Sequence, residues 1–134
     1  MNPKYALTIA VALVLGFACA LQAEDTADAR EELATAVPEA IRLLKSKQYE
    51  EFVESFIAPD DLKNITAKRS VEEFARQFAE THAASLLEVL QGIEGQRPKL
   101  DPDGKTATFI HGIKDAPRET ITFARIGKYW YIQN

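Results

Sequence analysis

The residues best suited to acid–base chemistry are two histidines, His82 and His111, the only ones in the chain. His82 lies on an otherwise apolar helical stripe and His111 ends a predicted strand, so the two rings could meet between helix and sheet. Together with Tyr49 they would form a ligand-binding site there. The alternative is that His82 is a partly exposed helix residue, or a core histidine with one backbone hydrogen bond. A metal is not expected, because metal sites usually need three or four ligands.

No other motif indicates catalysis. The serines lack a Gly-x-Ser-x-Gly setting, and the chain has no glycine-rich phosphate loop. The segment Asp101-Pro102-Asp103-Gly104 lacks the remaining ligands of a calcium loop and is explained by turn chemistry. We therefore assign no catalytic residue and expect no cofactor.

An acidic cluster surrounds the second predicted helix. Its members are Glu50, Glu51, Glu54, Asp60 and Asp61. The cluster is either a solvated face or a docking surface for a basic partner.

A pair of tyrosines is a second candidate surface. Tyr129 and Tyr131 flank Trp130 on the last predicted strand, so they share the outer face of the sheet. With Ile121 or Phe123 they would form an exposed aromatic patch, which would mark the contact surface of a partner or of a homodimer.

The first 23 residues have the layout of a signal peptide. Lys4 precedes an almost entirely apolar run from Ala6 to Leu21, which is shorter than the about 20 residues that a membrane span requires. We expect cleavage after Ala23 and a single exported domain over residues 24–134, either periplasmic or secreted. Lipidation of Cys19 and an uncleaved membrane anchor are the alternatives.

Charge and periodicity divide the remaining chain into two parts. The formal net charge of −4 argues against nucleic acid as a partner. Residues 24–94 hold 16 acids and 8 bases, whereas residues 95–134 hold 4 acids and 7 bases. The hydrophobic period also changes there, from that of a helix to that of a strand, which predicts helices followed by a sheet.

Three helices are predicted in the first part. One spans residues 27–46, where Pro38 either bends the axis or marks the true start of the helix. The next spans 48–57, and a short helical turn over 60–65 follows it. The third starts at the capping box Ser70-Val71-Glu72-Glu73 and continues to residue 93, with His82 on its apolar stripe.

The second part predicts an antiparallel meander of three to four strands. The strands are expected over residues 97–100, 105–113, 118–126 and 128–133. Trp130 is expected in the core, against Phe109 and Phe123. The predicted fold class is α+β, with three N-terminal helices packed on a C-terminal antiparallel sheet.

Three segments resemble small secreted bacterial proteins of the nuclear-transport-factor-2-like (cystatin-like) α+β roll. They are Gln48-Tyr49-Glu50-Glu51-Phe52, Asp103-Gly104-Lys105-Thr106-Ala107-Thr108-Phe109 and Gly127-Lys128-Tyr129-Trp130-Tyr131-Ile132. The resemblance implies a curled sheet whose outer face often forms dimers. In the isomerases and dehydratases of this class, Asp, His and Tyr line a deep cone. No such catalytic motif matches here, and the sheet is short, so no catalytic residue is carried over.

These observations favour an exported, non-enzymatic module that binds a partner or a small ligand through the open sheet face. The alternative is a small-molecule binder, or an isomerase- or dehydratase-like enzyme, with a helix–sheet pocket. In that case His82 would act as the acid or base, and Tyr49 or His111 would assist it.

Overall fold

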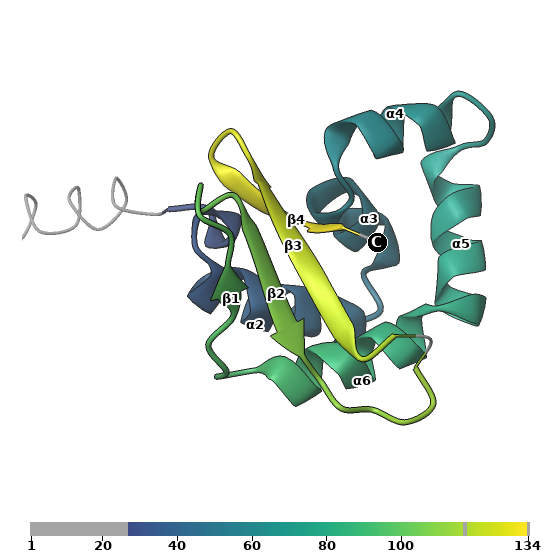
Figure 1. Cartoon of the computed structure of the whole chain (residues 1–134). Coiled ribbons are helices and arrows are strands. Elements are labelled where there is room, and N and C mark those ends of the chain that lie inside the picture. The colour runs from purple at the N-terminus through teal and green to yellow at the C-terminus, as the bar shows by residue number, and fades with distance from the viewer. Residues whose placement is uncertain (1–26, 117, 134) are drawn as a thin grey trace, which may run out of the picture.

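A computed structural model describes residues 27–116 and 118–133, so the predicted signal peptide over residues 1–23 lies outside the described residues. Helices come first and strands follow (Figure 1). The helical elements are the 3-10 turn η1 (Ala29–Glu31), α2 (Leu33–Lys45), α3 (Tyr49–Phe56), α4 (Pro59–Thr66), α5 (Val71–Thr81) and α6 (Ala83–Ile93). The strands are β1 (Lys99–Leu100), β2 (Thr106–Ile110), β3 (Thr120–Ile126) and β4 (Tyr129–Gln133). None of the described helices is long and apolar enough to cross a membrane.

The strands form one antiparallel sheet in the order β1-β2-β3-β4, which confirms the predicted meander and the α+β class. Ala107 of β2 pairs with Phe123 of β3, which in turn pairs with Ile132 of β4. Because side chains alternate along a strand, these residues share one face of the sheet. That face is the one turned toward the core.

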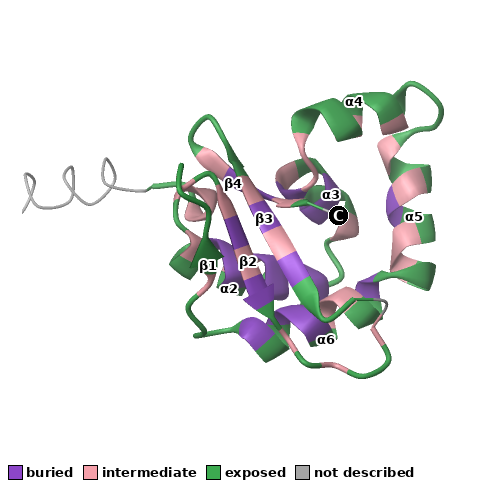
Figure 2. Cartoon of the chain, viewed as in Figure 1, coloured by how far each residue is buried: buried purple, intermediate pink, exposed green. Residues whose placement is uncertain are grey.

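The core lies between this face and the helices, as the buried segments of β2, β3, α2 and α6 show in Figure 2. Its largest fully buried side chains are Phe52, Phe56, Phe123, Leu43, Leu90, Ile93 and Val53. Trp130 is 6 % exposed and belongs to the same hydrophobic cluster as Phe109 and Phe123, so its predicted place in the core is confirmed.

The third predicted helix is divided at His82, where one unbroken helix to residue 93 was expected. Its predicted start is confirmed, because the backbone N–H of Glu73 donates to the Ser70 side chain at 3.1 Å. The backbone of His82 has φ −128° and ψ −22°, which ends α5 and begins α6. This bend allows α5 to pack on α3 while α6 packs on α2. Neither glycine nor proline lies at the break, and the apolar residues keep their helical spacing through it. The sequence therefore does not indicate the break.

The first predicted helix also starts later than expected. Residues 29–31 form the 3-10 turn η1, and the α-helix begins only at Leu33. Pro38 is exposed and lies inside α2, so the helix does not start at that proline.

Candidate functional site

The space between helices and sheet is filled by side chains, although a ligand pocket was one expectation for it. Phe109 and Phe123 meet edge to face, with ring centroids 5.8 Å apart, and both are buried. Leu90 and Ile93 of α6 are at most 1 % exposed in the same cluster. The interior on this side is a packed apolar core.

His82 lies outside that core. It is exposed at the junction of α5 and α6, and its Nδ1 lies 2.6 Å from the hydroxyl of Thr81. Its ring stacks nearly parallel to Phe78, with centroids 6.4 Å apart. The division of the helix at this residue explains why its position on the apolar stripe does not turn the ring inward.

His111 follows β2 and has different neighbours. Its Nδ1 accepts a hydrogen bond from the backbone N–H of Ile113 at 3.1 Å, and its backbone lies next to Gly92 of α6. In the part of the chain that the structure describes, the rings of His82 and His111 share no hydrogen bond. The structure therefore does not join these two candidates into one site.

The expected aromatic patch on the outer sheet face is largely covered. Tyr131 is only 8 % exposed and Tyr129 is half-buried, because the guanidinium of Arg30 lies over the Tyr129 ring. Ile121 and Phe123 are buried on the opposite, core-facing side, so the expectation that they extend this patch is wrong.

The described surface has an open groove of about 760 Å³ that α3 and α5 flank. The two helices are joined by Phe52 and Phe78, whose rings stack at 5.4 Å, and by Tyr49, which meets Phe78 edge-on at 6.3 Å. On α5 the lining residues Ala75 and Ala79 have small side chains, which leaves room between the helices. Tyr49, one of the predicted ligand-binding residues, therefore lines a groove that neither histidine lines, although the His82 ring stacks on the same Phe78.

Glutamates dominate the charge of this groove. Glu50, Glu51 and Glu54 come from α3 and Glu72 comes from α5. All four are exposed, and within residues 27–116 and 118–133 the ion pairs are Arg30–Asp28 and Arg42–Glu39, so none of the four is paired. Two cations, Lys47 and Arg76, also line the groove.

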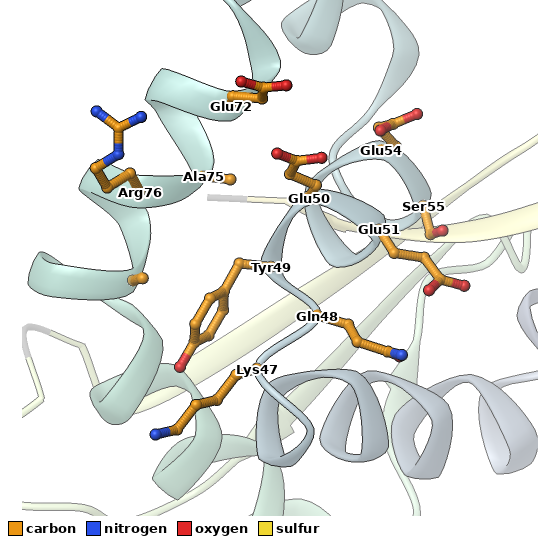
Figure 3. A pocket seen from close by; sticks show the side chains of 11 residues that line it. Lys47, Gln48, Tyr49, Glu50, Glu51, Glu54, Ser55, Glu72, Ala75 and Arg76 are labelled. Carbon is orange, nitrogen blue, oxygen red and sulfur yellow. The ribbon is translucent and has the colours of Figure 1, made fainter.

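Figure 3 shows how these side chains are arranged. Glu50 of α3 and Glu72 of α5 lie near each other at the upper end of the groove, whereas Glu54 extends from α3 on the side away from α5 and Glu51 points away from α5. The Tyr49 ring lies between α3 and α5, whereas Arg76 extends from α5 away from α3. The upper end of the groove is thus a negative region formed by two helices.

The acidic cluster that the sequence indicated is only partly the one that the fold assembles. Asp60 and Asp61 lie in the first turn of α4, outside the groove lining, where they stabilise the positive end of the helix dipole. Glu72 joins the cluster instead, because α5 packs on α3. The capping box identified Glu72 as the beginning of a helix, but no local signal in the sequence predicts that it faces α3.

The described residues contain no group of three or more His, Cys, Asp and Glu that could hold a metal ion. Neither a family model, nor a curated protein, nor a solved structure matches the chain. The geometry of the groove is therefore the basis for the functional conclusion.

Proposed function

We propose that the chain is an exported, non-enzymatic binding module that takes a basic segment of a partner protein in the groove between α3 and α5. The observation that carries the proposal is the set of four unpaired glutamates that two helices present to one hollow. A lysine or arginine of the partner would add positive charge to a lining in which four glutamates outnumber the two cations, Lys47 and Arg76.

The rest of the lining suits such a segment. The Tyr49 ring offers an apolar and π-rich surface to the stem and head of a basic side chain. The alanines of α5 leave the width that an extended peptide requires. Because the glutamates are exposed, the attraction would be screened by salt over a Debye length of about 8 Å at physiological ionic strength.

The test is binding of a fluorescein-labelled lysine–alanine repeat peptide, followed by fluorescence anisotropy at low and at physiological salt. The triple variant Glu50→Gln, Glu54→Gln and Glu72→Gln should bind about tenfold more weakly, since each exposed charge pair contributes about 0.5 kcal/mol. The affinity of the unaltered protein should fall as salt is added.

The matched control removes three carboxylates elsewhere on the helices, by Glu80→Gln, Glu88→Gln and Glu94→Gln. All three are exposed and none lines the groove. Equal loss of affinity in both triple variants would mean that the peptide senses only net charge, and the proposed groove would be wrong.

Two sequence predictions are kept as proposals beside this one. The order of helices and strands agrees with the nuclear-transport-factor-2-like roll, and membership of that class stays a prediction.

A homodimer through the outer sheet face also stays a prediction. Ile110 and Ile126 lie on that face and are 68 % and 47 % exposed. Sedimentation of an Ile110→Lys variant would test it, since a sheet-face dimer should dissociate.

A further inference from the structure

The guanidinium of Arg30 is surrounded by partners from three separate segments. Its Nε and Nη2 donate to the two carboxylate oxygens of Asp28 at 3.1 and 3.0 Å. Its Nη1 donates to the carbonyl oxygen of Ser55, at the end of α3, at 3.0 Å. Its Cζ lies 4.2 Å from the ring centroid of Tyr129 and 5.9 Å from that of Tyr131, both on β4.

These partners are of two kinds. Asp28 belongs to the same short segment as Arg30, here called the N-terminal strap (residues 28–31). Ser55 belongs to α3, and Tyr129 and Tyr131 belong to β4, so these partners lie outside the strap. The tyrosine ring stacks on the flat face of the cation, and the Ser55 carbonyl accepts a hydrogen bond at the edge of the cation. This arrangement suits the planar guanidinium of an arginine better than the compact ammonium of a lysine.

The strap has few other attachments. No residue of η1 is buried. Besides the Arg30 contacts, the strap is joined to α2 by the hydroxyl of Thr35, which donates to the carbonyl of Ala29 at 2.6 Å. The three residues of η1 are half-buried, and the guanidinium provides the side-chain contacts that join the strap to β4 and α3.

The surroundings of the site are acidic as well as aromatic. A cavity of about 260 Å³ next to Arg30 is lined by Glu39 of α2 and Glu51 of α3. Glu39 is paired with Arg42, whereas Glu51 has no ion-pair partner among the described residues. A second cation that replaced Arg30 would thus enter a region of favourable potential.

We propose that the Ser55 carbonyl and the rings of Tyr129 and Tyr131 form an arginine-binding site. The chain's own Arg30 fills the site in this structure, and an arginine of another chain fills it when the strap is released. The ligand class is a guanidinium group. This site is separate from the α3–α5 groove and does not depend on the function proposed for that groove.

Chemical rescue of an Arg30→Ala variant tests the site in the full chain. The variant should unfold about 5 °C lower than the unaltered protein, because a partly buried cation–π contact and a charged hydrogen bond are lost. Ethylguanidinium, added well below denaturing concentrations, should restore part of this shift in the variant. Ethylammonium at the same concentration should not, and neither ion should raise the unfolding temperature of the unaltered protein.

Exchange with another chain is tested with a labelled peptide that has the sequence of residues 27–33. It should bind Arg30→Ala measurably and the unaltered protein at least about tenfold more weakly, because Arg30 occupies the site there. The same peptide with lysine for its arginine should bind less well, as should the original peptide to the double variant Arg30→Ala, Tyr129→Ala.

Three results would overturn the proposal. An unchanged unfolding temperature in Arg30→Ala would show that the site is not occupied in a stabilising way. Equal rescue by both ions, or by neither, would remove the preference for guanidinium. Failure of the peptide to bind Arg30→Ala would leave Arg30 as a structural contact with no exchangeable site.

Discussion

Helix α3 lies between two regions that differ in how their charged side chains are paired. On the side of η1 and β4, the chain brings its own cation, Arg30, to a carbonyl oxygen, two aromatic rings and the Asp28 carboxylate. On the side of α5, glutamates face an open groove without an ion-pair partner among the described residues. Glu51 and Ser55 line the hollows on both sides, so one helix contributes to both regions.

The comparison distinguishes a contact that stabilises the fold from an exposed surface whose glutamates have no ion-pair partner among the described residues. Charges that are satisfied within the chain contribute to folding, and their removal should lower the free energy of unfolding. Exposed like charges that are not satisfied contribute little, or oppose folding slightly, and their removal should affect binding more than stability. Changes to either side of α3 should therefore have effects of different kind.

The largest effect on stability is expected from Phe52, which packs in the core beneath α3, the helix that both regions share. Phe52 is 2 % exposed and stacks on Phe56 within α3 and on Phe78 of α5. Phe52→Ala should lower the free energy of unfolding by about 3–5 kcal/mol, because a large buried ring leaves a cavity. Urea denaturation followed by the fluorescence of Trp130, the only tryptophan, measures the change.

Phe52→Leu is the matched control and should cost clearly less, since it keeps most of the apolar volume. If Phe52→Ala cost under about 1 kcal/mol, α3 would not be the shared support that the comparison requires.

The second prediction concerns the groove side alone. Ser70 accepts a hydrogen bond from the backbone N–H of Glu73 and thereby caps the helix that carries Glu72. Ser70→Ala should lower the free energy of unfolding by about 1 kcal/mol and weaken binding of the lysine–alanine peptide, because the first turn of α5 frays. Rescue of Arg30→Ala by ethylguanidinium should be unaffected in this background.

Ser46→Ala provides the control. The Ser46 hydroxyl is exposed and donates to the carbonyl of Arg42 at the C-terminal end of α2. A loss of peptide affinity as large in Ser46→Ala as in Ser70→Ala would contradict a specific role of the α5 cap.

The sequence predicted the architecture better than either of these regions. Alternation along β4 placed Trp130 in the core, and the capping box placed the start of α5, because both signals are local. The break at His82 was missed, since it arises from α5 and α6 packing on different neighbours. The groove and the Arg30 site were missed for the same reason. Nothing near Arg30 in the sequence indicates that it meets Tyr129, and nothing near Glu72 indicates that it faces α3.

A third and smaller effect concerns the Arg30 side and depends on pH. The side-chain hydrogen bond from Arg30 holds the pKa of Asp28 below its ordinary value of 3.8, although partial burial opposes this shift. A depressed pKa means that the stabilisation is present above the unfolded-state pKa and is lost as the pH falls through the folded-state value. Asp28→Asn keeps a side chain that can cap η1, so it isolates the charge.

Thermal unfolding of Asp28→Asn and of the unaltered protein gives the measurement. At pH 7 the substitution should cost about 0.5 kcal/mol, a small value because the Asp28 side chain is 37 % exposed and screened by solvent. The two proteins should converge below about pH 3.8. In an Arg30→Ala background the difference should shrink to the part that comes from the backbone N–H of residue 30, which still donates to the Asp28 carboxylate. An undiminished difference would show that the Arg30 side chain is not the group through which the Asp28 charge stabilises the fold.

The smallest effect has the opposite sign and belongs to the groove side. Glu54 lies in the last turn of α3, near the negative end of the helix dipole, and four residues after Glu50. Glu54→Gln removes both repulsions and should raise the free energy of unfolding by about 0.3–0.5 kcal/mol. Glu50→Gln also removes the repulsion between the glutamates, but it loses a favourable charge in the first turn, so it should leave stability nearly unchanged. Urea titrations of the two variants side by side measure the difference. A destabilised Glu54→Gln would mean that this carboxylate already has a cationic partner within the chain. The charged side chains on both sides of α3 would then be paired, and the comparison would fail.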